Sequence, residues 1–267
     1  MRAMSFPLSK VRITSTLVAA GLLGSSTLRL PVRELSLPGW SCTVSGGTIL
    51  GLLLVGLTCT GMQAIVSDHP GTSSQSRHRA LLHWILPTLL TATAWASMDR
   101  LGTIQHGLVG ASAAGAALAA LMTCEHRLAH SDGHRRPLVL SALRLSAYAV
   151  ATILYAAIPP RISVAGAAAV TLSSTALVLR LIWDDGSTGR ISLWLAVGLG
   201  AALGALSLAT SFRSENPLQH ALELVIVLYT STGLARHWLL GRLTRRVLAE
   251  FAVIATVAFA LLVSFAH

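Results

Sequence analysis

Charged residues are scarce in this sequence. They make up 11% of the 267 residues, whereas 53% are apolar, and the mean hydropathy is +0.67. An average soluble domain carries roughly 25% charged residues. The chain therefore lacks the polar side chains that would cover a water-facing surface, and its composition indicates an integral membrane protein.

Cysteine and lysine are almost absent, and each shortage excludes a class of chemistry. The three cysteines, Cys42, Cys59 and Cys124, are too few for a disulfide framework, and none forms a CxxC pair of the kind that binds zinc. Lys10 is the only lysine, and it precedes the first apolar run. A retinal Schiff base needs a lysine inside a membrane span, so that linkage is excluded.

The motifs of the common hydrolases are also missing. The sequence has no HExxH, Walker loop or GxSxG elbow. The segment GASA, at 110–113, shares only part of the GxSG pattern of rhomboid proteases, because the second glycine is absent. The histidines His83, His106 and His220 lie near the ends of apolar runs, which gives no support to a tetrapyrrole site. We therefore predict a protein that is not an enzyme, and any cofactor is unknown.

Apolar runs are what the sequence has in abundance. A membrane-spanning helix needs about 20 apolar residues. Nine runs approach this length, at residues 13–30, 44–66, 81–98, 104–123, 138–158, 162–183, 191–211, 218–235 and 247–265. The linkers between them are too short for a soluble domain.

The first run is the weakest of the nine, because ITSTLVAAGLLGSSTLRL is short and rich in serine and threonine. It resembles the apolar part of a signal peptide, although no clean Ala-x-Ala cleavage site follows. We expect an all-α, polytopic transmembrane helical bundle of about nine spans, or eight if the first is not real. Residues 1–12 then form a cytoplasmic tail, and residues 13–267 form a single transmembrane domain.

The cations predict the orientation. Assigned to alternating sides of the nine runs, thirteen fall on the side of the N-terminus and five on the other. The positive-inside rule then places the N-terminus in the cytoplasm and the C-terminus outside, in a bacterial cytoplasmic (inner) membrane. Because the cations are scattered between apolar runs, we expect no nucleic-acid partner.

Small residues predict where helices pack closely. Gly47 and Gly51 form one GxxxG pair, and Gly200 and Gly204 form another. Such pairs let two helix backbones approach each other within lipid. We expect a packing role for all four glycines.

Ionisable residues inside the runs are candidates for function, because each costs about 2.5–3.5 kcal/mol at the centre of a bilayer. Arg144 and Arg180 lie close enough to a helix end to reach the head groups, and Glu250 falls in the first turn of its helix. Glu223 is about two turns inside its run and is the strongest candidate.

His220 precedes Glu223 by three residues, so both share one helix face. His106 begins another run at the same membrane level. The set His106, His220 and Glu223 is a candidate proton-handling, ion or metal site, since imidazole and carboxylate bind such ions. The alternative is a buried glutamate satisfied by a neighbouring helix.

A histidine-rich stretch, CEHRLAHSDGHRR at 124–136, separates two runs. On a continuous helix its histidines would form a metal-binding stripe. Asp132-Gly133 breaks such a helix, however, so a solvated loop is favoured.

An arginine-rich stretch, RHWLLGRLTRR at 236–246, separates the last two runs. It either lies on lipid head groups or acts only as a topogenic signal, and the second is favoured. The head-group candidates are Arg236, Arg242, Arg245 and Arg246.

The C-terminal third carries a resemblance. The segment VLYTSTGLARHWLLGRLTRRVLAEF at 227–251 and the triplet Ile85-Leu86-Pro87 resemble a family of polytopic bacterial membrane proteins of unknown function, seen notably in green non-sulfur bacteria. The likeness covers roughly residues 80–265, and the first two spans look like an addition. The family implies a helical membrane protein and no established activity.

Three functions remain open. The first is a structural or accessory subunit that contacts the lipid bilayer and other membrane subunits or copies of itself. The second is a small proton- or ion-coupled transporter that uses Glu223 and His220. The third is an intramembrane enzyme acting on lipid or peptide, centred on Ser112 or on the His106, His220 and Glu223 set.

Overall fold

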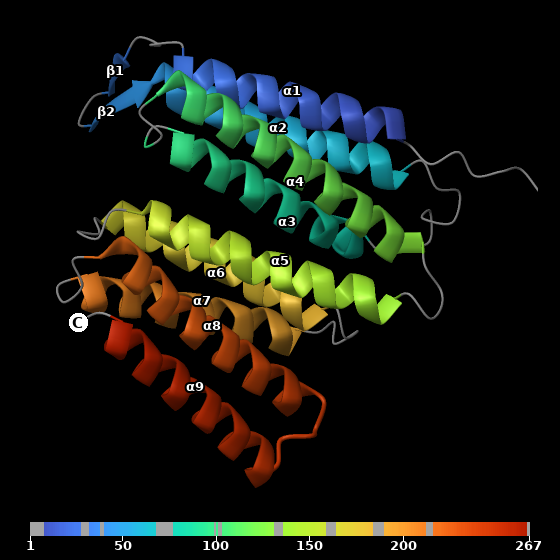
Figure 1. Ribbon diagram of the computed structural model, residues 1–267, viewed down its shortest axis with the longest axis vertical. Coiled ribbons are helices and arrows are strands. Elements are labelled where there is room, and N and C mark those ends of the chain that lie inside the picture. Colours follow the sequence, from blue (N-terminus) through green and yellow to red (C-terminus); the bar gives the residue numbers. More distant parts are fainter. Residues whose placement is uncertain are drawn as a thin grey trace, which may run out of the picture. The chain divides into compact units, whose positions relative to one another are not determined.

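The chain folds into helices at each predicted apolar run (Figure 1). The computed structural model describes residues 8–27, 32–37, 40–67, 77–98, 100, 103–130, 136–158, 164–183, 190–211 and 216–265. Within them the helices are α1 Leu8–Thr27, α2 Gly46–Ser67, α3 Arg77–Met98, α4 Ile104–His130, α5 Arg136–Ala157, α6 Val164–Trp183, α7 Arg190–Ser211, α8 Pro217–Leu239 and α9 Arg245–Phe265. The predicted all-α class is confirmed.

Six of the described helices are long and apolar enough to cross a membrane, namely α2, α4, α5, α6, α7 and α9. The protein is therefore a multi-pass membrane protein. The other three helices carry more polar residues: serines and threonines in α1, Arg77 and Arg79 in α3, and His220 with Glu223 in α8.

A short β-hairpin precedes α2 and was not predicted. Strand β1, Val32–Leu37, pairs antiparallel with β2, Trp40–Ser45, and Leu37 is opposite Trp40. Only Pro38 and Gly39 separate the strands in sequence, and a two-residue connection containing glycine favours a hairpin.

Two compact units make up the fold, Met1–Val139 and Leu140–His267, and we describe each by itself. In the first unit, helices α1 to α4 form a ring in which each contacts the next and α4 contacts α1. Their core includes Leu22, Met62, Ile65, Leu118 and Met122, all fully buried or nearly so.

Polar contacts also join α2 to α3 inside the first unit. The hydroxyls of Thr58 and Thr91 lie 2.9 Å apart, and Thr91 donates to the carbonyl of Pro87, which lies within α3. Gly51 of α2 faces the ring of Trp95, where a Cβ atom would collide. The two helices therefore lie close together along this line.

In the second unit, α7 packs against α6, and α8 packs against α6, α7 and α9. A Cβ atom on Gly200 would lie 2.8 Å from the carbonyl oxygen of Thr171, and one on Gly204 would lie 3.1 Å from that of Ala167. Any larger residue would push α7 away from α6. Side-chain hydrogen bonds tie α5 to the unit, including one of 2.7 Å between the hydroxyls of Tyr155 and Ser174.

Candidate functional site

The predicted set His106, His220 and Glu223 is divided between the two units. His106 is exposed on α4 of the first unit, whereas His220 and Glu223 lie on α8 of the second. Within the described part of the chain, no three His, Cys, Asp or Glu side chains are gathered so that they could hold a metal ion.

His220 connects α8 to α7. Its imidazole is 1% exposed, and its two nitrogens lie 3.3 Å from the Ser207 hydroxyl and 3.0 Å from the Thr210 hydroxyl. The Thr210 hydroxyl donates its own proton to the carbonyl oxygen of Leu206, 2.9 Å away, so it accepts from Nδ1 of the imidazole, and the Ser207 hydroxyl donates to Nε2. Ser207 is itself fully buried. These hydrogen bonds join α8 to α7. Glu223 lies one turn further along α8 and is half-buried.

A buried acid–histidine pair lies between α3 and α4. Glu125 is fully buried, and its Oε2 atom lies 2.8 Å from Nδ1 of His83. A carboxyl group in such a place is stable only when it is protonated or has a hydrogen-bonded partner. The pair is therefore a place in the first unit where a proton or a charge is held inside the helices.

The predicted solvated loop at 124–136 is wrong for its first half, since α4 continues to His130. The signal for Glu125 was available in the spacing: Leu118, Leu121 and Met122 are buried, and Glu125 follows them at the three- and four-residue steps of one helix face. Hydropathy alone ended the predicted run at residue 123 because the next residues are polar.

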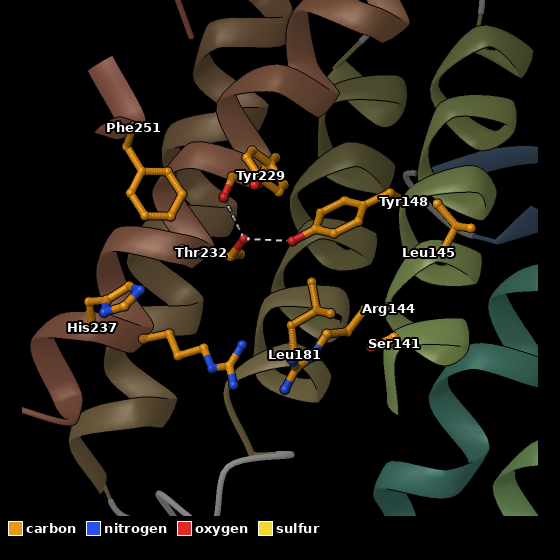
Figure 2. A pocket seen from close by; sticks show the side chains of 11 residues that line it. Ser141, Arg144, Leu145, Tyr148, Leu181, Tyr229, Thr232, His237 and Phe251 are labelled. Carbon is orange, nitrogen blue, oxygen red and sulfur yellow. Dashed lines mark hydrogen bonds between the residues drawn. The ribbon is translucent and has the colours of Figure 1, made fainter. Parts of the chain in front are cut away.

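A basic cavity of about 410 Å³ opens in the second unit (Figure 2). It is lined by parts of α5, α6, α8 and α9, and its cationic side chains are Arg144 and Arg236. Both are half-buried. None of the lining residues is Asp or Glu, so the described wall of the cavity carries positive charge without a carboxylate.

The hydroxyls of Tyr148 and Thr232 meet on one side of the cavity, 3.1 Å apart (Figure 2). Thr232 donates its own proton to the backbone, where the carbonyl oxygen of Leu228 is 2.6 Å away. Tyr148 is therefore the donor to Thr232. Arg144 and Arg236 both lie near enough to Tyr148 to interact with it electrostatically.

Aromatic rings form another part of the wall. The ring of Tyr229 is 5.5 Å from that of Tyr148 and 5.9 Å from that of Phe251, and His237 follows at 6.0 Å from Phe251. Gly233 lies beneath the Phe251 ring, where a Cβ atom would collide with it. These contacts fix the start of α9 against α8.

Sequence reasoning picked out Arg144 and Arg236 separately and did not bring them together. Arg144 precedes Tyr148 by one helical turn, and Arg236 follows Thr232 by one turn. The contact between Tyr148 and Thr232, 84 residues apart in the chain, places both arginines at one cavity. Only the packing of α5 on α8 shows this.

The arginine-rich stretch at 236–246 contains no helix of its own. Helix α8 continues to Leu239, Gly241 turns the chain with φ of 64°, and α9 begins at Arg245. Arg242, Arg245 and Arg246 are exposed, and Arg246 pairs with Glu250 at 3.1 Å.

Comparison with known proteins identifies a family. No curated protein and no solved structure matches the chain. The profile of a family of proteins of unknown function, DUF5656, matches residues 28–265 and so includes α2 through α9. The prediction that the first two spans lie outside the family's common part is therefore wrong for the second span, which corresponds to α2. The chain belongs to the DUF5656 family of proteins of unknown function.

Proposed function

We propose that this protein is a non-enzymatic accessory subunit of a membrane complex, located in the bacterial cytoplasmic membrane. The observation that carries the proposal is α9: no residue of its membrane-crossing segment, Arg245–Ser264, is buried within the chain, whereas half of the corresponding segment of α6 is buried. Val253, Val257 and Leu261 form an exposed apolar stripe on α9 at four-residue steps. We assign this stripe to a helix of another membrane protein.

Photo-crosslinking in native membranes tests the assignment. A crosslinking residue at Val257 is compared with one at Leu172 of α6, which is also an exposed apolar position. We expect a second polypeptide of discrete mass to be captured from Val257 and not from Leu172. Lipid adducts alone from both positions, or a product of twice the mass of the chain, would overturn the accessory role.

The proposal includes the predicted orientation, with the N-terminus in the cytoplasm and the C-terminus outside. The excess of cations on one side supports it. An alkaline phosphatase fused after His267 is expected to be active, because this enzyme folds only outside the cytoplasm. If the fusion protein is present in normal amounts but inactive, the C-terminus lies in the cytoplasm and the predicted orientation is wrong.

A second candidate function is a proton-coupled transporter, and the His83–Glu125 pair favours it. Ionisable groups held inside membrane helices often carry protons along a transport path. The predicted candidates Glu223 and His220 are tested in the same experiment. Glu223 is only half-buried, whereas Glu125 is fully buried, so the pair is the stronger candidate.

Proton uptake into liposomes containing the purified protein, driven by a potassium diffusion potential, separates these sites. Glu125→Gln is expected to abolish the uptake, and Glu250→Gln, which alters an exposed acid, is expected to preserve it. Loss of uptake in Glu223→Gln instead would move the coupling site to α8. If liposomes with the unaltered protein take up protons no faster than empty liposomes, the transporter function is rejected.

A further inference from the structure

The cavity of the second unit has an aromatic side as well as a basic one. We propose that it binds the ring of a membrane-soluble quinone, a planar ring with two carbonyl groups and an apolar tail, against the aromatic side chains of α5, α8 and α9 and beside His237. A quinone is neutral, so its binding requires no unpaired charge in the wall. The accessory role requires no such site, and either proposal can fail without the other.

One ring nitrogen of His237 is buried at the cavity. His237 lines the cavity, and its Nδ1 atom has no hydrogen-bond partner within the part of the chain that the structure describes. Buried polar atoms are nearly always hydrogen-bonded, so an orphan at a cavity points to a group that the protein does not supply. That group must also fit an aromatic surface, because the His237 ring lies 6.0 Å from the ring of Phe251.

A quinone satisfies this nitrogen in either neutral form of the imidazole. When Nδ1 of His237 carries the proton, it donates to a carbonyl oxygen of the quinone. When Nδ1 is bare, it accepts from a hydroxyl of the reduced ring, the hydroquinone. Figure 2 shows Tyr148 across the cavity from His237, and the two oxygens of a quinone lie at opposite edges of its ring. The Tyr148 hydroxyl donates to Thr232, 3.1 Å away, so its oxygen is an acceptor for the hydroquinone.

Three aromatic side chains give the wall its flat surfaces. Tyr148 of α5, Tyr229 of α8 and Phe251 of α9 all line the cavity. Tyr229 contacts both other rings, with centroids 5.5 Å from that of Tyr148 and 5.9 Å from that of Phe251. Aromatic rings prefer further rings in offset or edge-to-face positions about 4.5–7 Å away. The wall therefore favours a planar ring as the occupant.

The size and the opening of the cavity suit a ligand that arrives from the bilayer. The volume of about 410 Å³ falls within the range of about 300–1,000 Å³ typical of ligand pockets. Leu145 lines the cavity and is 73% exposed on α5, a helix long and apolar enough to cross a membrane. The cavity thus reaches the apolar surface of the unit, where the tail of the quinone would lie in lipid.

Thermal unfolding of the full-length protein in neutral detergent measures the binding. The probe is decylubiquinone, and decanol, which has the same tail and no ring, is the control compound. We expect saturable stabilisation by decylubiquinone and none by decanol, because a ligand that binds only the folded protein raises its stability. Equal stabilisation by both compounds would show that the cavity takes up a tail rather than a ring, and would overturn the proposal. No stabilisation by decylubiquinone would also overturn it.

His237→Phe tests the hydrogen bond, because it keeps a ring and removes Nδ1. We expect an affinity for decylubiquinone about threefold to tenfold weaker, which is the effect of losing one neutral hydrogen bond. His237→Asn keeps a polar atom near the position of Nδ1 and should restore part of the affinity. An unchanged affinity in His237→Phe would show that the imidazole does not contact the ligand, and would overturn the proposal.

Tyr229→Leu tests the aromatic wall. It removes the ring that contacts both Tyr148 and Phe251, and we expect an affinity about threefold to tenfold weaker. Trp194→Leu is the matched control, since Trp194 is an exposed aromatic residue of α7 that does not line the cavity. Its affinity should stay within about twofold of the unaltered protein. Equal weakening in both variants would mean that the quinone adsorbs to exposed rings, and would overturn the site.

Leu145→Trp provides a test if the variants of His237 and Tyr229 do not fold. Because Leu145 is exposed, a larger side chain is accommodated on the surface of α5, where it narrows the opening of the cavity. We expect unchanged thermal unfolding without ligand and weaker stabilisation by decylubiquinone. Undiminished stabilisation in this variant would place the ligand elsewhere and would overturn the proposal.

Discussion

The two units place the ionisable side chains among their helices in different surroundings. In the first unit, the buried carboxyl of Glu125 is held by an imidazole 2.8 Å away. In the second unit, Arg144 and Arg236 share a cavity that has no acidic residue in its described wall. The charged group of the first unit is thus enclosed between two helices, whereas the cations of the second unit line a cavity.

This difference separates two meanings of an intramembrane charge. A paired group such as Glu125 contributes to folding or carries a proton, and its removal should first affect stability. A half-buried cation at a cavity, such as Arg236, is less enclosed, and its removal should affect stability less. Four substitutions test whether the units differ in this way.

The largest loss of stability is expected for His83→Leu. The substitution leaves the fully buried Glu125 without this partner, and breaking a buried pair costs about 3–5 kcal/mol. The free energy of unfolding in mixed micelles measures the effect. His106→Leu, an exposed histidine of the same unit, is the control and should cost less than about 0.5 kcal/mol. A similar cost at both positions would mean that the pair is not a special contact.

Gly200→Ala should come next. The added Cβ meets the Thr171 carbonyl oxygen at 2.8 Å, and crowding of this kind costs about 1–3 kcal/mol. Gly198→Ala provides the control, because nothing lies within 4 Å of its Cβ position, and no loss is expected. If Gly200→Ala is as stable as Gly198→Ala, helix contact is not what holds the second unit together.

Tyr155→Phe should have a smaller effect. It removes the buried hydrogen bond of 2.7 Å to Ser174, and such a bond contributes about 0.5–1.5 kcal/mol. Tyr148→Phe removes the bond of 3.1 Å at the cavity, and we expect it to cost less because its hydroxyl is less buried. A larger loss for Tyr148→Phe would show that the cavity wall, rather than the closed core, holds α5 in place.

Glu250→Gln should have the smallest effect. Its partner Arg246 lies one turn away, both side chains are exposed, and pairs of this type contribute about 0.3–0.5 kcal/mol. Unfolding measured at low and high salt should give nearly the same value for the variant. A cost above about 1 kcal/mol would mean that this end of α9 is covered by another chain in the sample.

The positions of the helices were largely predictable, because apolar runs of about 20 residues have few other uses. The ends were less predictable. Helix α8 ends at Leu239, four residues after the predicted end, because Arg236 and His237, which end the apolar run, belong to its last turn. The β-hairpin was missed because each of its strands has only six residues.

The candidate sites were predictable only one residue at a time. The chemistry of Arg144, Arg236 and His220 drew attention to each of them. The contacts around them could not be inferred, because Ser207, which bonds to His220, and Thr232, which bonds to Tyr148 at the cavity, are ordinary residues in sequence. Glu125 was overlooked for the opposite reason: its polar neighbours hid the apolar face to which it belongs.

Pro87 gives the His83–Glu125 pair a further role. Proline has no N–H, so it cannot donate to the carbonyl of His83, the residue four positions before it in α3. The helix loses a backbone hydrogen bond at the turn whose side chain binds Glu125 of α4. The side-chain bond does not satisfy the His83 carbonyl, but it holds this weakened turn of α3 against α4. For this reason, the first unit should tolerate loss of the pair better once Pro87 is replaced by alanine.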